Sequence, residues 1–177
     1  MTAPLTIEQV PSADLGADRM DEVRRLCDAA YGEATGPYFE AIGAGVHLLG
    51  LREGELVSHL MWVTRWLEPE GTRPLKAAYV EQVATRPAEQ GRGYATRLLE
   101  ALAPRLSDFE LGALCPATDG LYLRVGWRYW RGPLFVRQEG SRIPTPDERV
   151  MILDLPRTPA LNLDGPLSVE WRPGEVW

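Results

Sequence analysis

The chain has 177 residues, of which 45% are apolar and 25% charged, and 19 Lys and Arg against 25 Asp and Glu give a net charge of −6. This length and composition predict a single domain over residues 1–177 with a hydrophobic core of its own. The sequence has neither the run of about 18 apolar residues that a transmembrane helix needs nor a secretory signal. The acidic balance, without a basic run, argues against nucleic acid or a membrane as a partner.

The cysteines and histidines show no pattern of metal ligation. Cys27 and Cys115 form no CxxC motif, and His47 and His59 belong to no cluster with ligand spacing. A histidine pair with this separation is more often structural than a pair of ligands. We therefore expect no metal, buried reduced cysteines and a cytoplasmic location.

Apolar periodicity and the positions of Gly and Pro predict strands interleaved with helices. In the first half we expect a strand at 5–10, helices at 17–31 and 38–42, strands at 46–52 and 56–66, a loop at 67–74 and a strand at 77–85. In the second half we expect a helix at 91–106, a strand at 111–114, a short helix at 120–125, strands at 127–137 and 149–155 with a loop at 143–147 between them, and an edge strand in the tail at 168–177. This order indicates an α/β domain with a mixed sheet.

A glycine-containing loop, residues 90–95, joins a predicted strand to a predicted helix. Glycines let successive main-chain N–H groups point inward, and the helix N-terminus adds positive potential, so the loop can hold a pyrophosphate. A tight turn at the start of the helix explains the same residues. The loop lacks the G-x-G-x-x-G motif of dinucleotide-binding proteins and the Gly-Lys-Ser/Thr of a P-loop.

The strand before this loop carries a carboxylate among apolar residues. Regular alternation would place Glu81 on one face with Tyr79, Val83 and Thr85. A buried carboxylate is costly unless it is paired or hydrated, so Glu81 lies at an edge, forms a salt bridge or serves as a general base beside the bound cofactor.

The pattern of a strand, Gln-x-x-Gly-x-Ala and a helix resembles the GCN5-related N-acetyltransferase (GNAT) superfamily. Within it, the chain is similar to the aminoglycoside 2'-N-acetyltransferases. The matching segments are Tyr79-Val-Glu-Gln-Val-Ala84, Leu111-Gly-Ala-Leu114, Leu121-Tyr122 with Gly126-Trp127, Thr145-Pro-Asp147 and the closing Trp171-Arg-Pro-Gly-Glu-Val-Trp177. The resemblance implies a GNAT fold, with a mixed, mostly antiparallel central sheet that is splayed at the acetyl-CoA site and flanked by helices.

The resemblance also implies roles for individual residues in direct acetyl transfer from acetyl-CoA to an amine. Glu81 matches the carboxylate that takes a proton from the substrate ammonium through water, and Tyr122 matches the tyrosine that protonates the departing CoA thiolate. The residues implied to bind acetyl-CoA are Val83, Ala84, Thr85, Gln90, Gly91, Arg92, Gly93, Tyr94 and Ala95. For Arg92, an exposed loop side chain is an equally good interpretation.

On the acceptor side, the resemblance implies an acidic site for a cationic amino sugar. Its residues are Glu33, Tyr38, Gln82, Cys115, Asp147, Glu175 and Trp177 with its terminal carboxylate. Tyr38 stands where the family has a second Asp and Cys115 where a Ser is typical. An atypical aminoglycoside with fewer cationic groups, such as kasugamycin, would fit fewer carboxylates.

We therefore expect an antibiotic-resistance acetyltransferase that uses acetyl-CoA and no metal, and forms a homodimer as is common in the superfamily. The alternatives are an acetyltransferase of another small amine or peptide amine, and an acyl-CoA-binding module without turnover. A covalent role for Cys115 is not expected, since direct transfer needs no acetyl-enzyme.

Overall fold

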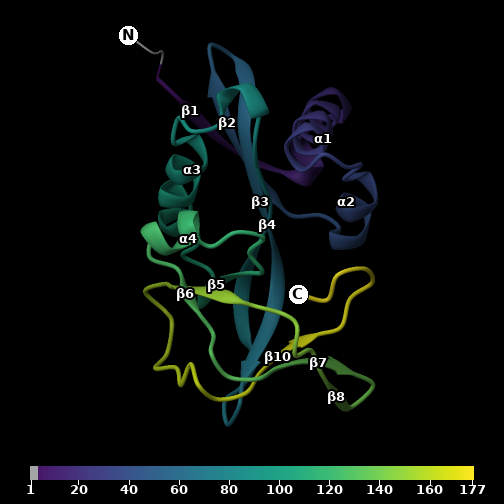
Figure 1. Cartoon of the computed structure of the whole chain (residues 1–177), viewed down its shortest axis with the longest axis vertical. Helices are drawn as coiled ribbons and strands as arrows, with labels where there is room; N and C mark the ends of the chain where they lie inside the picture. The colour runs from purple at the N-terminus through teal and green to yellow at the C-terminus, as the bar shows by residue number, and fades with distance from the viewer. Residues whose placement is uncertain (1–3) are drawn as a thin grey trace. The chain divides into compact units, whose positions relative to one another are not determined.

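The computed structural model describes residues 4–177 (Figure 1), so the first three residues of the predicted domain lie outside the described part. It divides into two compact units. The N-terminal unit comprises the residues up to Val63 together with Val80–Leu102, and the C-terminal unit comprises Thr64–Tyr79 and Ala103–Trp177. The prediction of one domain stays a prediction, although strands β3 and β4 each contribute to both units.

The N-terminal unit combines a small antiparallel sheet with helices. Its elements are β1 (Thr6–Pro11), η1 (Ser12–Asp14), α1 (Ala17–Tyr31), α2 (Gly36–Ile42), β2 (Val46–Arg52), the first part of β3 (Glu55–Pro69), the second part of β4 (Leu75–Thr85), η2 (Pro87–Glu89) and α3 (Tyr94–Leu102). β2 pairs antiparallel with both β1 and β3. Helices α1 and α2 lie on one side of these strands and α3 on the other (Figure 1).

The C-terminal unit contains the remaining strands. Its own elements are η3 (Ala103–Arg105), β5 (Leu111–Leu114), α4 (Gly120–Arg124), β6 (Arg128–Tyr129), β7 (Leu134–Gln138), β8 (Ser141–Pro144), β9 (Met151–Asp154) and β10 (Leu167–Glu170). The strands pair in the orders β6-β9-β5-β4 and β3-β10-β7-β8. β4 with β5 and β7 with β10 are parallel, whereas the other pairs of this unit are antiparallel. The predicted α/β class with a mixed, mostly antiparallel sheet is thus confirmed.

Apolar periodicity explains why the regular elements form where they do. α1 buries Val23, Leu26 and Cys27 on one face and stops at Gly32, whose left-handed conformation lets its N–H donate to the Asp28 carbonyl. In the C-terminal unit, Trp127 lies in the core with its ring edge-on to Tyr122, at 6.2 Å between centroids. Among residues 4–177, no helix is long and apolar enough to cross a membrane.

Several predicted elements are corrected by long-range pairing. β3 continues to Pro69 through the predicted loop, because Leu67–Pro69 pairs with β10. The strand predicted at 127–137 is two strands, β6 and β7, separated at Gly132-Pro133, where the proline lacks the N–H that a ladder needs. β8 occupies the start of the loop predicted at 143–147. The tail strand is not an edge, since β10 lies between β3 and β7.

Candidate active site

The loop between β4 and α3 has the geometry of an anion-binding main chain. Gly91 and Gly93 have φ angles of +76° and +78°, a left-handed conformation that a residue with a Cβ rarely adopts. Apart from the adjoining residues of the loop, no atom of residues 4–177 lies within 4 Å of the place where a Cβ would stand on either glycine, so the main chain faces open space there. The loop ends at the first turn of α3, where free N–H groups and the helix dipole favour a negative group. These residues therefore fit the pyrophosphate of a nucleotide-containing substrate.

The side chain of Arg92 is engaged with a carboxylate of the same loop region. Its Nε lies 3.4 Å from Glu89 Oε2, and Arg52 Nη1 lies 2.9 Å from the same oxygen. The Arg92 side chain is about half exposed, at 47%. Because Arg92 is paired with Glu89, the main chain at Gly91 and Gly93 is the part of the loop that is open to an anion.

The end of β4 departs from regular strand geometry at Gln82. Its φ angle is +52°, so the strict alternation predicted for this strand is wrong here, and Glu81, Gln82 and Val83 are all half-buried. Glu53 and Glu139, the other residues with a Cβ and a positive φ among residues 4–177, both precede glycine in hairpin turns. The Gln82 side-chain oxygen is buried and has no hydrogen-bond partner among the described residues. A polar ligand group or water is the expected partner of such an atom.

Two carbonyl groups beyond Gln82 accept hydrogen bonds from side chains. The Tyr31 hydroxyl at the end of α1 donates to the Val83 carbonyl at 2.8 Å, and Gln90 Nε2 donates to the Thr85 carbonyl at 3.1 Å. Both donors are exposed side chains. The main chain that the sequence implies for the pantetheine arm is thus held by groups that a ligand can displace.

The structure brings His47 and His59 together inside the N-terminal unit. His47 Nδ1 lies 2.9 Å from His59 Nε2, and both side chains are almost fully buried. Burial lowers the pKa of His47 to about 4 and that of His59 to about 3, so both rings are neutral. The sequence held a signal for this contact: in the hairpin of β2 and β3, His47 is opposite Met61, so His59 is its diagonal neighbour on the same face.

Tyr122 is placed by the short helix α4 in the C-terminal unit. Its side chain is buried, and desolvation raises the pKa of the phenol to about 12. The phenol is therefore protonated at any working pH, as a proton donor must be.

The last residue of the chain is anchored within the C-terminal unit. Trp177 is only 3% exposed, and its indole N–H donates to Thr145 Oγ1 at 2.8 Å. Arg172 Nη2 lies 3.4 Å from the terminal oxygen of Trp177, and Arg65 Nη2 donates to the Val176 carbonyl at 3.0 Å. Side chains of Thr145, Arg172 and Arg65 thus hold the segment at Val176 and Trp177.

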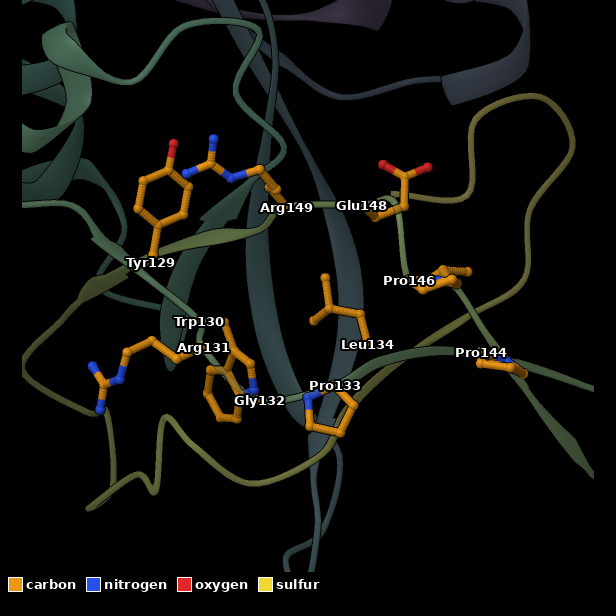
Figure 2. Close-up of a pocket in the computed structure, with 11 residues that line it drawn as sticks. Tyr129, Trp130, Arg131, Gly132, Pro133, Leu134, Pro144, Pro146, Glu148 and Arg149 are labelled. Carbon is orange, nitrogen blue, oxygen red and sulfur yellow. The ribbon is translucent and has the colours of Figure 1, made fainter.

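A cavity of about 720 Å³ opens in the C-terminal unit next to this anchor (Figure 2). Its lining includes Trp130, Pro144 and Thr145, the residue that accepts the Trp177 hydrogen bond. Glu148 also lines it and accepts a hydrogen bond from the Cys115 thiol at 3.5 Å. Burial is the main reason that the pKa of Cys115 rises to about 11, so the thiol is protonated.

The predicted acidic acceptor residues lie on the surface. Glu33, Asp147 and Glu175 are exposed, while Tyr38 is half-buried on α2. Sequence reasoning chose Asp147 and missed its neighbour Glu148, which lines the cavity. No local signal separates two adjacent carboxylates in a loop, because their directions depend on how the loop packs. Among the described residues, no group of three or more His, Cys, Asp or Glu side chains could hold a metal ion.

Comparison with known proteins defines the class. Residues 13–130 match the model of an acetyltransferase (GNAT) domain. The structure is similar to a GNAT family N-acetyltransferase (YhbS) from Escherichia coli in complex with CoA, with a TM-score of 0.62 at 12% identity over 96% of this chain and 89% of that one. The structure is also similar to a GCN5-related N-acetyltransferase from Kribbella flavida, with a TM-score of 0.58 at 20% identity. The match covers 75% of this chain and 34% of that longer protein. These similarities show the GNAT fold.

The aminoglycoside 2'-N-acetyltransferase of Mycolicibacterium fortuitum is 32% identical over 180 residues, covering 97% of this chain and 92% of that protein. The chain belongs to the GNAT superfamily and, within it, to the aminoglycoside 2'-N-acetyltransferase family. It is an acetyltransferase that uses acetyl-CoA, as the sequence predicted.

Proposed function

We propose that this acetyltransferase transfers the acetyl group of acetyl-CoA to the 2'-amine of an aminoglycoside and thereby confers antibiotic resistance. The observation that carries the proposal is the 32% identity to an aminoglycoside 2'-N-acetyltransferase over 97% of the chain. The GNAT domain alone would leave the amine open, since this fold serves many acceptors. A cytoplasmic location and a homodimer stay predictions.

Acetyl-CoA would be held mainly by main-chain groups of the N-terminal unit. The open glycine conformations at Gly91 and Gly93 support pyrophosphate binding by N–H groups from Gln90 to Ala95. The side-chain hydrogen bonds to the carbonyls of Val83 and Thr85 support a pantetheine arm that pairs with β4 from Val83 through Ala84 to Thr85. Tyr94 is buried at the start of α3, so its contribution would come from its N–H.

The chemistry would be direct attack of the free amine on the thioester carbonyl. Glu81 would accept the proton of the ammonium through water, because an ammonium of pKa about 10.4 cannot attack. As the C–S bond breaks, Tyr122 would donate its proton to the CoA thiolate; burial raises the pKa of the phenol to about 12, which keeps it protonated but makes it a weaker acid, so the donation depends on close geometry. The raised pKa of the Cys115 thiol argues against a thiolate nucleophile and an acetyl-enzyme.

The acceptor would be a cationic amino sugar. The exposed carboxylates of Glu33, Asp147 and Glu175 would attract its ammonium groups, and the unpartnered Gln82 oxygen would accept a hydrogen bond from one of them. Trp177, which is bonded to the cavity-lining Thr145, would also contribute to the acceptor side. Tyr38, which stands where the family has a second Asp, leaves one carboxylate fewer and favours an aminoglycoside with few amines, such as kasugamycin.

The substrate is tested by thiol release from acetyl-CoA with gentamicin, tobramycin, kasugamycin, spermidine and a short peptide, followed by mass spectrometry of the product. We expect acetylation at the 2'-amine of an aminoglycoside. Turnover of spermidine or the peptide alone would establish the alternative of another amine. Binding of acetyl-CoA without any product would establish a non-catalytic module. Expression in a sensitive bacterium tests resistance through the inhibitory concentration of the preferred antibiotic.

The mechanism is tested by Glu81→Gln and Tyr122→Phe. Loss of a general base or acid typically costs about a hundredfold or more in rate, so we expect kcat to fall by that factor with acetyl-CoA affinity kept. Glu100→Gln, on the exposed face of α3, is the matched control and should leave kcat unchanged. Full activity of Glu81→Gln would refute the base. Initial-rate patterns should be sequential, because no acetyl-enzyme forms.

A further inference from the structure

A continuous hydrogen-bonded network runs through the interior of the N-terminal unit and ends on β4. Ser12 Oγ lies 3.0 Å from His47 Nε2, His47 Nδ1 lies 2.9 Å from His59 Nε2, and His59 Nδ1 lies 2.9 Å from the Gln82 carbonyl oxygen. We call Ser12, His47 and His59 the histidine network. Its histidines are 1% and 0% exposed, so water does not replace these bonds.

The positions of the two imidazole protons follow from the end of the network on a carbonyl. A carbonyl oxygen only accepts, so His59 carries its proton on Nδ1 and, being neutral, accepts at Nε2. His47 therefore donates from Nδ1 and accepts at Nε2 from the Ser12 hydroxyl, although the Gly45 carbonyl, also 3.0 Å from Ser12 Oγ, competes for that one proton. The N–H of Gly45 donates to Ser12 Oγ at 2.9 Å and fixes that hydroxyl. Each imidazole is thus locked in one tautomer and one orientation.

The far end of the network lies at the irregular point of β4. A left-handed φ inside a strand is unfavourable for a residue with a Cβ, and such geometry persists only where surrounding bonds hold it. His59 supplies a bond to the Gln82 carbonyl itself. On the following residues, Ser58 Oγ donates to the Ala84 carbonyl at 3.1 Å and the Arg86 N–H donates to the Val57 carbonyl at 2.9 Å. Gln82 stands between Glu81 and Val83, so its conformation sets the direction of both.

We propose that His59 is a positioning residue of acetyl transfer: its Nδ1–H holds the left-handed Gln82 and thereby aims the Glu81 carboxylate and the Val83 main chain at acetyl-CoA. His47 and Ser12 act through His59 by fixing its ring. The inference rests on the proposed roles of Glu81 and Val83. The network does not conduct the substrate proton, because a carbonyl oxygen does not take up a proton at a working pH.

The variants separate positioning from packing. His59→Leu keeps most of the volume and removes the donor, whereas His59→Asn places an amide donor at the position of Nδ1. Leu48→Val is the matched control, since Leu48 is fully buried in the same sheet and lies outside the network. We expect His59→Leu to lower kcat by about tenfold or more and to weaken acetyl-CoA binding by a similar factor, since small misplacements of reacting groups have effects of this order. His59→Asn should stay within about threefold of the wild type.

Stability and acetyl-CoA affinity are measured on the same proteins, so that a structural role gives a different result. If His59→Leu and Leu48→Val lose stability alike while acetyl-CoA affinity and kcat stay normal, His59 is a packing residue and the inference falls. Affinity needs no acceptor, so the absence of turnover in the wild type would refute the proposed function alone. If His59→Leu does not fold, nitrogen NMR of the wild type decides: a proton on His59 Nδ1 supports the network, and one on Nε2 overturns it.

Discussion

In the N-terminal unit, the end of β4 is held by neutral groups, whereas in the C-terminal unit the tail is held by charged ones. Both histidines are neutral: His47 donates to His59, and His59 donates to the Gln82 carbonyl. Arg65, by contrast, is 3% exposed and donates to Glu170 Oε1 at 2.8 Å and to the Val176 carbonyl at 3.0 Å. The guanidinium groups of Arg65 and Arg172 lie 5.3 and 5.5 Å from the centre of the Tyr79 ring.

The two arrangements respond to different perturbations. A neutral network costs little to bury but fails when acid forces a charge into it. A buried ion pair behaves in the opposite way. It persists in acid until its carboxylate is protonated, but removing one partner leaves an unpaired buried charge and lowers the stability of the fold. The comparison therefore predicts that replacing an arginine side chain destabilises the tail most. Lowering the pH should destabilise the end of β4 most.

Replacement of Arg65 should have the largest effect on stability. Breaking a buried pair costs about 3–5 kcal/mol, and the partial exposure of Glu170, at 37%, reduces this to about 2–4 kcal/mol for Arg65→Gln. Urea unfolding measures the loss.

Arg131→Gln is the control for this change. Arg131 pairs with Asp164 at 2.7 Å, but both side chains are more than half exposed, at 59% and 67%. Exposed pairs contribute about 0–1 kcal/mol, so the control should unfold close to the wild type. If Arg65→Gln and Arg131→Gln lost the same free energy of unfolding, Arg65 would not be the residue that holds the tail.

Acid should destabilise the N-terminal unit first. Burial lowers the pKa of His47 and His59 from 6.5 to about 4 and about 3, so below pH 6.5 the unfolded chain binds protons that the folded chain does not. Stability is therefore present above pH 6.5 and lost as the pH falls towards 4, by at most about 1.4 kcal/mol per pH unit for each histidine. His59→Asn should flatten this slope by about half.

The C-terminal unit should lose stability over a lower pH range than the N-terminal unit. Glu110 binds Arg73 and accepts the Lys76 N–H at 2.9 Å, and these contacts lower its pKa from 4.5 to about 2. Its contribution is present above pH 4.5 and disappears only as the pH falls from there towards 2. Hydrogen exchange of β2 and β5 amides between pH 6.5 and 4.5 would separate the two pH ranges, and loss of β5 protection before β2 would contradict this order.

Trp177→Phe should have a smaller effect and act on the acceptor side. The loss of one buried indole N–H costs about 1 kcal/mol, because Thr145 keeps access to other partners through its rotating hydroxyl. If the tail contacts the amino sugar, the acceptor KM should rise by about threefold to tenfold while the acetyl-CoA KM stays the same. Trp66→Phe, at an exposed position, is the control, and a change in acetyl-CoA KM alone would oppose the assignment.

Strong periodicity made parts of the fold predictable. The helix at 17–31 and the strand at 111–114 have the predicted bounds, because each is fixed by its own apolar pattern and a flanking stop. The extension of β3 to Pro69 was not predictable, since its partner Leu167 lies about a hundred residues further along. The same pairing with distant strands places β10 inside the sheet.

In the candidate site, too, the features fixed by local sequence were predictable and those fixed by distant contacts were not. The left-handed main chain of the glycine loop was predictable, because the residue type itself reveals such conformations. The left-handed Gln82 was missed, because glutamine has no preference for that conformation and the contact that holds it comes from β3. The cavity-lining Glu148 was missed for a related reason, since loop packing decides which of two adjacent carboxylates faces inward.

Arg92→Gln should have the smallest effect on acetyl-CoA binding, although the loop that contains it is central to the proposal. Its guanidinium is about half exposed and already lies 3.4 Å from Glu89, so it adds little net positive charge to the open glycine site. Exposed pairs contribute about 0–1 kcal/mol, and we expect the acetyl-CoA KM to rise by no more than about threefold. Gly93→Ala should raise it several times further, because alanine is strained at a φ of +78° and would turn the neighbouring N–H groups away. If Arg92→Gln raised the acetyl-CoA KM more than Gly93→Ala, the arginine side chain rather than the glycine main chain would be the main contact of the pyrophosphate.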